Sequence, residues 1–281
     1  MITEFSRTEM LIGPEAVSAL KHSTIVIFGV GGVGSHAIEA LARSGAGRLV
    51  LIDNDTVSLT NINRQSIALH STIGQYKTQV MAKKIHDICP HTSVHTFEEF
   101  VLPDTLEGLF ERILSLPAPD EDETGAGTAH STEHRTKSQA VQPDSSSITY
   151  ILDAIDNVSA KIALAVYADK HSIPLISSMG TGNKLHPELF RISDLKETSV
   201  CPLCRVMRKE LKARGIKNLK VCWSASCPRS NRRGYRQPQG HSGKHCFRSS
   251  CGRAYDRGSD CTGDLQSIKK ELTGTPFHQI T

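Results

Sequence analysis

The sequence lacks any long apolar run, and no stretch approaches the ~20 apolar residues that a membrane-spanning helix needs. Its first residues, Met-Ile-Thr-Glu-Phe-Ser-Arg, also lack the basic and then apolar order of a secretory signal peptide. Neither charge sign is in large excess, and the net charge of +4 permits a nucleic-acid partner without requiring one. We therefore expect a cytoplasmic protein with no membrane partner.

Cysteine is not scarce, but its distribution limits what it can do. Four of the eight cysteines lie in the first 224 residues, and the others crowd into the tail. Without an export signal, we expect free thiols or metal ligands rather than disulfides. Only Cys201-Pro-Leu-Cys204 has the spacing of a zinc-ligand pair, and half of a tetrahedral site is weak evidence for zinc. We interpret Cys201 and Cys204 as two free thiols at or near the start of a helix.

The strongest local pattern is a glycine cluster between a strand and a helix. The β-branched run Thr24–Phe28 ends in Gly29-Val-Gly31-Gly32-Val-Gly34, and a helical pattern follows over Val33–Ser44. Glycines let the backbone approach a ligand closely, and a helix N-terminus presents free N–H groups to an anion. This order predicts a nucleotide site. The alternative is a tight turn that holds no ligand.

A dense polar segment follows the next predicted strand. Asp53 ends the apolar run Leu49–Asp53, where a carboxylate commonly binds a ribose hydroxyl. Arg64 offers a planar fork for phosphate oxygens, and Asn61, Asn63 and Gln65 can orient their neighbours. Lys77 opens a predicted helix, Lys77–Ile88, where an ammonium is unfavourable unless an anion lies there. A solvated lysine would be the simpler interpretation if Lys77 stood alone.

The N-terminal stretch Phe5–Leu20 reads as one amphipathic helix. Its apolar side would be formed by Met10, Leu11, Ala16 and Leu20. Arg7 lies near the start of that helix, where a solvated surface arginine is the default interpretation.

The rest of the patterned region continues the alternation of strands and helices. Residues 117–147 are polar and without periodicity, and we expect a disordered insertion rather than a domain. Asp156 and Asn157 follow a strand that ends at Asp153. They either cap the next helix or supply the hard oxygen ligands that Mg²⁺ requires. The further predicted elements are the strands Val94–Phe97 and Ile148–Asp153 and the helices Leu106–Leu116 and Ser159–Lys170.

Four ordered motifs resemble the nucleotide-binding signature of the ubiquitin-activating-enzyme-like family, which includes the ThiF, MoeB and HesA proteins. The motifs are Gly29-Val-Gly31-Gly32-Val-Gly34, Leu51-Ile-Asp53-Asn-Asp55, Asn61-Ile-Asn63-Arg64-Gln65 and Gly74-Gln-Tyr-Lys77. The resemblance implies an α/β fold with a modified Rossmann-type doubly wound sheet, usually dimeric, that binds Mg-ATP and adenylates carboxylates.

The same resemblance assigns roles to single residues. Asp156 would hold Mg²⁺ beside the ATP phosphates, with Asp153 behind it. Arg64 and Lys77 would offset charge that develops on those phosphates, and Arg7 would reach the ATP of a partner subunit. The remaining ATP-binding candidates are the four loop glycines, Asp53, Asp55, Asn61, Asn63, Gln65 and Asn157.

Within the family, the chain resembles the tRNA threonylcarbamoyladenosine dehydratases. This resemblance implies ATP-dependent adenylation of the threonylcarbamoyl carboxylate on a tRNA adenosine, followed by cyclisation with loss of AMP. A strongly basic helical segment, residues 201–214, suits tRNA phosphates. The segments that carry the resemblance are Arg43-Ser-Gly45, Ser177-Ser-Met-Gly-Thr-Gly-Asn-Lys184, Asp194-Leu-Lys-Glu-Thr198 and Arg205-Val-Met-Arg-Lys-Glu-Leu-Lys212.

Two alternatives stay open. One is activation of the C-terminal glycine of a ubiquitin-like sulfur carrier of the ThiS or MoaD type, whose activating enzymes commonly carry two Cys-x-x-Cys pairs. The other is an inactive nucleotide-binding remnant, which the presence of Arg64, Lys77 and Asp156 argues against and the tail argues for.

The tail, residues 225–281, departs from the pattern of domain 1–224. Its first part, Ala225 to Gly263, contains no valine, isoleucine, leucine or methionine. The family would place here a loop reading roughly Pro-Gly-Ser-Ile-Ala-Phe-Val-Pro-Pro-Val-Ala-Gly. Codons allowed for His241 to Asp260, shifted by one nucleotide, can spell that loop. Our hypothesis is an out-of-frame product, by mutation or sequencing error, with the shift between about Trp223 and Arg233.

Overall fold

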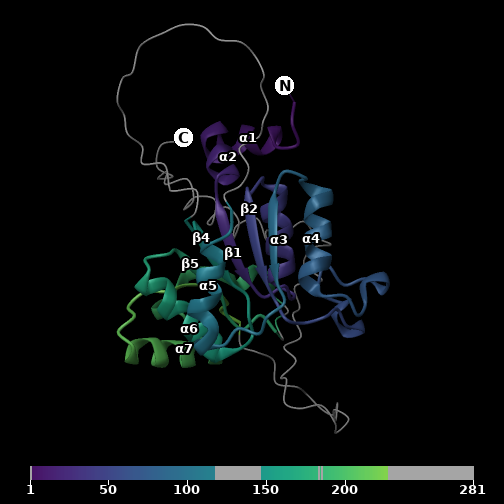
Figure 1. The fold of residues 1–281 in the computed structure, drawn as a ribbon. Helices are drawn as coiled ribbons and strands as arrows, with labels where there is room; N and C mark the ends of the chain where they lie inside the picture. The colour runs from purple at the N-terminus through teal and green to yellow at the C-terminus, as the bar shows by residue number, and fades with distance from the viewer. Residues whose placement is uncertain (1, 118–146, 183, 185, 227–281) are drawn as a thin grey trace, which may run out of the picture.

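The computed structural model describes residues 2–117, 147–182, 184 and 186–226 (Figure 1). Within these residues, seven strands form one sheet in the order β3-β2-β1-β4-β5-β7-β6, and all neighbouring strands are parallel except β6 and β7. The strands are β1 (Thr24–Phe28), β2 (Arg48–Ile52), β3 (Ser93–Phe97), β4 (Tyr150–Asp153), β5 (Leu175–Ser178), β6 (Phe190–Asp194) and β7 (Lys220–Ser224). The α-helices are α1 (Ser6–Ile12), α2 (Pro14–Lys21), α3 (Gly34–Arg43), α4 (Lys77–Ile88), α5 (Leu106–Leu114), α6 (Val158–Lys170) and α7 (Pro202–Ala213).

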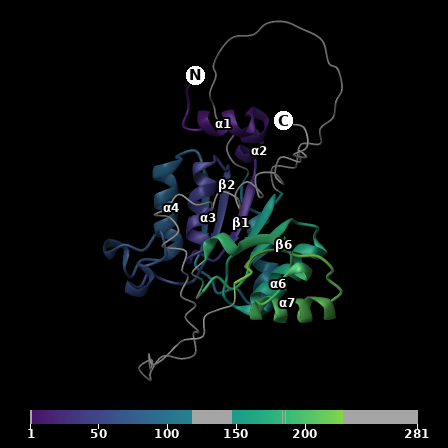
Figure 2. The same ribbon diagram turned by 180° about the vertical axis from the view of Figure 1, so that it is seen from behind.

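Helices cover both faces of the sheet because the central strands are apolar on both sides. Ile25 and Ile27 of β1 belong to the core that includes side chains of α3 and α4. Val26 and Phe28, which point the other way, belong to the core that includes side chains of α5, α6 and α7. Figure 2 shows α3 and α4 on one flank and α6 and α7 on the other. This is the doubly wound α/β arrangement that the sequence predicts.

Most element bounds agree with the sequence prediction to within two residues. The first strand and the helix that begins at Lys77 have the predicted bounds. The helix after the glycine cluster begins at Gly34 rather than Val33, and α5 ends at Leu114. The parallel strands are recognisable because each is a short apolar run that ends in glycine or a polar residue.

The prediction of one N-terminal helix is wrong, because two helices form there. Gly13 has φ +85° and a proline follows it, so the first helix cannot continue. Met10 and Leu11, which were predicted on the buried side, are 88% and 71% exposed. Ala16 and Leu20 are buried as predicted, and both belong to the second helix.

Two predicted features lie outside the described residues, apart from their edges. They are the disordered insertion, residues 117–147, and the out-of-frame tail, residues 225–281. Among the described segments, no helix is both long and apolar enough to cross a membrane.

Candidate nucleotide-binding site

The candidate site lies at β1, where the chain stops adding strands on one side of this strand and begins to add them on the other. β1 pairs with β2 on one side and with β4 on the other, and all three strands are parallel. The carboxyl ends of these three strands therefore lie at one edge of the sheet. The segments that follow them lead away in opposite directions and leave a crevice between them. Ligands of open α/β sheets bind in such a crevice. The three segments that follow these strands begin with Gly29, Asp53 and Ala154.

The glycine turn combines two tightly packed glycines with one that faces open space. A Cβ on Gly29, which has φ +95°, would lie 2.7 Å from the Ala154 carbonyl oxygen, and one on Gly34 would lie 1.8 Å from the Gly29 carbonyl oxygen. These two positions hold the turn against the segment after β4. A Cβ on Gly31 would meet only Gln65 Nε2, at 4.0 Å. The turn thus leaves room at Gly31 for a ligand to approach the backbone.

Asp53 braces this turn from the end of β2. Its Oδ2 accepts a hydrogen bond from Val30 N at 2.7 Å, and its Oδ1 accepts one from Asp55 N at 2.8 Å. Burial raises the pKa of Asp53, while the Lys77 charge and the two backbone donors oppose that rise. Both carboxylate oxygens already have backbone partners, so a ribose contact would use their remaining lone pairs and stays a prediction.

Lys77 is a buried cation held between two carboxylates. Its Nζ lies 2.8 Å from Asp55 Oδ2 and 3.9 Å from Asp53 Oδ2, and the residue is only 5% exposed. The solvated-lysine interpretation is therefore excluded. Lys77 also opens α4, so the two carboxylates compensate an ammonium that the N-terminus of that helix would otherwise disfavour.

The polar segment after β2 is held together largely by its own hydrogen bonds. Asn61 Oδ1 accepts from Ser58 N at 2.9 Å, and Arg64 Nη1 donates to the Asn63 side chain at 3.0 Å. Gln65 is buried beside the glycine turn, and its Oε1 has no hydrogen-bond partner among the described residues. A buried polar atom without a partner is costly, so Gln65 Oε1 is a candidate contact for a bound ligand.

The two acids after β4 have contrasting surroundings. Asp153 is fully buried, and Lys161 Nζ lies 3.1 and 3.0 Å from its Oδ1 and Oδ2. Asp156 is exposed, and its carboxylate has no hydrogen-bond or ion-pair partner in the described part of the chain. Asn157 caps α6, since its Oδ1 accepts from Ala160 N at 3.2 Å.

These surroundings fit a magnesium ion that is held mainly by a nucleotide. Among the described residues, no group of three or more side chains of the usual metal-ligating types could enclose an ion. Mg²⁺ commonly keeps several waters and binds one or two carboxylates together with substrate phosphates. The single unpaired carboxylate of Asp156 suits that mode and does not suit a metal cage made only of protein.

Lys161 is the residue that the sequence prediction missed. Its Nζ also lies 2.7 Å from the Ser178 carbonyl oxygen, and Ser177 Oγ donates to Asp153 Oδ2 at 2.5 Å. Lys161 therefore ties the carboxyl ends of β4 and β5 to α6. The available signal was a lysine among the mostly apolar residues in the first half of α6, and this lysine is 1% exposed in the structure.

Arg7 does not join the other candidates within one chain. It is exposed on α1, at the amino end of the sheet. The Phe5 ring packs there, 3.2 Å from the point where a Cβ on Gly45 would stand, shortly before β2 begins. The glycine turn follows the carboxyl end of β1, and Figure 1 shows α1 and α2 beyond the opposite end.

Cys201 and Cys204 are two free thiols at the start of α7, as predicted. Both are buried. Hydrogen bonds from the Cys204 thiol and from backbone N–H groups, including that of Gly180, lower the pKa of Cys201 to about 5. The hydrogen bond to Cys201, together with burial, raises the pKa of Cys204.

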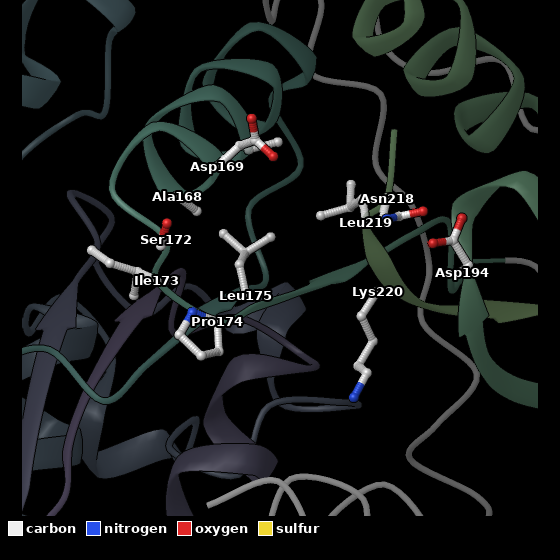
Figure 3. Close-up of a pocket in the computed structure, with 11 residues that line it drawn as sticks. Ala168, Asp169, Ser172, Ile173, Pro174, Leu175, Asp194, Asn218, Leu219 and Lys220 are labelled. Carbon is white, nitrogen blue, oxygen red and sulfur yellow. The ribbon is translucent and has the colours of Figure 1, made fainter. Parts of the chain in front are cut away.

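A separate cavity of about 510 Å³ lies away from these residues (Figure 3). It opens at the amino ends of β5 and β7, between Leu175, Asp194 and Lys220. The parallel strands place this cavity at the opposite edge of the sheet from the glycine turn. It is therefore not part of the candidate nucleotide site.

Comparison with known proteins adds a family and several relatives. The model of the ThiF family matches residues 5–219. The tRNA threonylcarbamoyladenosine dehydratase of Bacillus subtilis (strain 168) is 39% identical over 229 residues, which cover 81% of this chain and 77% of the relative. The protein of that name from Escherichia coli (strain K12) is 34% identical over 209 residues, which cover 74% of this chain and 65% of the relative.

The solved structures agree with the sequence matches. The crystal structure of the E. coli tRNA N6-threonylcarbamoyladenosine dehydratase in complex with ATP has a TM-score of 0.65 and 32% identity, and the match covers 80% of this chain and 82% of that one. A complex of the same protein with AMP is similar at 30% identity. The molybdopterin-synthase adenylyltransferase of E. coli (strain K12) is 42% identical, but over 76 residues that cover only 27% of this chain.

Proposed function

This chain belongs to the ThiF family, and from that premise we propose that it is an ATP-dependent tRNA threonylcarbamoyladenosine dehydratase. The observation that carries the proposal is the extent of the match: 81% of the chain aligns with a dehydratase of that name, against 27% with a molybdopterin-synthase adenylyltransferase. The substrate is then a tRNA, and we place the protein in the cytoplasm.

The reaction has two steps. First, a carboxylate oxygen of the threonylcarbamoyl group attacks the α-phosphorus of ATP, and pyrophosphate leaves. A nitrogen of the same group then attacks the activated acyl carbon, AMP leaves, and a ring closes. The net change is the loss of one water, whose oxygen ends on AMP. Such catalysis depends mainly on positioning and on neutralisation of phosphate charge.

Each candidate residue has a role consistent with its surroundings. The open backbone at Gly31 and the N-terminus of α3 would receive the phosphates. Lys77 is fixed by Asp55 and needs little reorganisation to face negative charge. Arg64 would supply further positive charge. When bound at Asp156, Mg²⁺ would neutralise phosphate charge and orient the leaving pyrophosphate.

We further propose that the working form is a homodimer. Arg7 lies on α1 at the far end of the sheet from the glycine turn, so it can contribute only to the site of another chain. The exposed side chains of Met10 and Leu11 on the same helix offer apolar surface for a partner.

The test is turnover of tRNA that carries threonylcarbamoyladenosine, in the presence of ATP and Mg²⁺. Nucleoside mass spectrometry should show conversion to a product lighter by one water, with one AMP and one pyrophosphate released for each turnover. Asp156→Asn should abolish the conversion, whereas Asp104→Asn, at an exposed position before α5, should not.

The two alternative functions are distinguished by a pyrophosphate-exchange assay. Pyrophosphate exchange that depends on a sulfur carrier with a C-terminal glycine, and not on tRNA, would support the carrier-activating alternative. ATP binding without exchange in either case would support an inactive remnant.

A further inference from the structure

We propose that three exposed cations on α7, namely Arg205, Lys209 and Lys212, bind the phosphate backbone of the tRNA. We call them the α7 basic stripe. This inference rests on the proposed function, since it names the surface that holds the substrate outside the nucleotide crevice.

The stripe is a geometric consequence of helical spacing. Positions separated by four and three residues lie on one face of a helix, and the three cations span about 10 Å along it. All three are exposed. The buried side chains of the same helix are Cys204, Met207 and Leu211, which pack into the core on the other side.

Stability of the helix accounts for Lys212, which lies in the last turn where a cation is favoured, but not for Arg205. No acidic residue stands in the first turn of α7, and Arg205 lies near its N-terminus, where a cation opposes the helix dipole. Glu210 is the only acid on the helix, and its Oε2 is paired with Arg214 Nη1 at 2.8 Å. The stripe is therefore left without an intramolecular anion.

Some exposed cations elsewhere also lack a side-chain partner among the described residues, as Lys83 and Arg191 do, but these lie on different elements and form no row. Arg43, Arg112 and Lys170 each form an ion pair with a glutamate. In contrast, the cations of the stripe have no hydrogen-bond or ion-pair partner within the described residues. Unpaired cations in a row complement a regularly spaced row of phosphates, as RNA presents.

The stripe begins at the edge of the sheet where the chemistry is proposed. Cys201 stands at the N-cap position of α7, and its Sγ lies 3.7 Å from the point where a Cβ on Gly180 would stand. Gly180 comes shortly after β5, the neighbour of the strand that leads to Asp156. An RNA backbone on the stripe would thus lie beside the crevice, so that a nucleotide can enter while the flanking phosphates stay bound.

The test compares two variants that each lose three positive charges. The first is Arg205→Gln/Lys209→Gln/Lys212→Gln. The matched control is Lys83→Gln/Arg112→Gln/Lys170→Gln, which removes exposed cations from α4, α5 and α6. Binding of threonylcarbamoyladenosine-bearing tRNA is measured by gel shift at several salt concentrations, without ATP. ATP binding and thermal melting are measured on the same samples.

The stripe variant should bind tRNA at least about tenfold more weakly, and the slope of log affinity against log salt should fall by about 2 to 3, as the loss of three phosphate contacts requires. The control should bind as the wild type does, and all three proteins should bind ATP alike. Equal tRNA affinity and slope in both variants would overturn the inference, as would loss of affinity only for an acidic carrier protein. Because binding is read without turnover, absence of cyclisation would count against the proposed function alone.

Discussion

Asp153 and Asp156 lie three residues apart and have different roles because their surroundings differ. Asp153 compensates the buried ammonium of Lys161, which has few other partners. Asp156 is exposed and has no partner in the described part of the chain. Both acids stand in one short motif that the sequence linked to Mg²⁺. Burial and the pairing with Lys161 separate the structural acid from the candidate ligand.

Substitution of the two acids should therefore give opposite phenotypes. Asp153→Asn leaves the Lys161 charge poorly compensated inside the protein, and we expect the free energy of unfolding to fall by roughly 3–5 kcal/mol. Asp156→Asn should leave the unfolding midpoint unchanged but reduce pyrophosphate exchange about 100-fold or more. Urea unfolding and exchange assays measure both. A stable, inactive Asp153→Asn protein would contradict this assignment.

Cys201 should be a thiolate over most of the pH range. Its pKa is lowered to about 5, against roughly 8.5 for an unfolded cysteine. A depressed pKa adds stability that is fully present above the unfolded value and is lost as the pH falls through about 5. Thiolate absorbance of the folded protein should thus persist down to about pH 5. This thiolate absorbance should be absent in Cys201→Ser. In Cys204→Ser it should be lost at a higher pH than in the wild type. The control Cys89→Ser should titrate as the wild type does.

At the scale of the element, the glycine turn shows that one motif serves packing and binding at different positions. Gly29 and Gly34 are needed because backbone lies where their side chains would be, whereas a Cβ on Gly31 would meet only Gln65 Nε2, at 4.0 Å. The sequence pattern treats these glycines alike. The structure divides them into two kinds.

Alanine substitutions should separate the two kinds. Gly34→Ala places a Cβ 1.8 Å from the Gly29 carbonyl oxygen and should destabilise the fold by about 3 kcal/mol or more. Gly31→Ala should melt as the wild type does and bind ATP about tenfold more weakly, a change of about 1.4 kcal/mol. Gly108→Ala in α5, where nothing lies within 4 Å, is the control and should not lower stability. Unchanged ATP affinity in Gly31→Ala would argue against a phosphate contact there.

The elements that the sequence predicts well are those with local signals. β1 and α4 have the predicted bounds because apolar periodicity and turn residues define them. The break at Gly13 is also encoded locally, by a glycine followed by a proline, although the apolar pattern alone predicts one helix. The Lys161–Asp153 pair and the orphaned Gln65 Oε1 depend on how α6 and the segment after β2 pack on the sheet, which spacing along the chain does not fix. Pairing of the edge strand β6 with its antiparallel neighbour β7 is likewise a tertiary property.

At the scale of the whole molecule, the distance between Arg7 and the glycine turn makes the dimer testable. Arg7→Ala and Lys77→Ala should each be inactive if both residues serve one composite site. When the two variants are unfolded together and refolded as a mixture, half of the dimers are mixed, and each of these has one site with both residues intact. Activity should then return to about a quarter of the wild-type level. Continued inactivity of the mixture, with dimers confirmed by light scattering, would place Arg7 outside the site.

Residues 225–281 are the part of the chain whose composition conflicts with the rest. A stretch without valine, isoleucine, leucine or methionine, as at 225–263, has little apolar surface to bury against the sheet that ends in β7 and β6. We propose that the gene encodes the missing apolar segment in the shifted frame. The nucleotide sequence between the codons of about Trp223 and Arg233 decides this directly, and a shifted frame that does not encode an apolar loop ends the proposal.

If the shifted frame encodes the apolar loop, the frame-restored protein should turn over tRNA faster and melt at a higher temperature than this chain, because added apolar burial stabilises the core. Both forms keep every candidate ATP-site residue, so they should bind ATP with similar affinity. Equal turnover of the two would show that domain 1–224 suffices for the reaction.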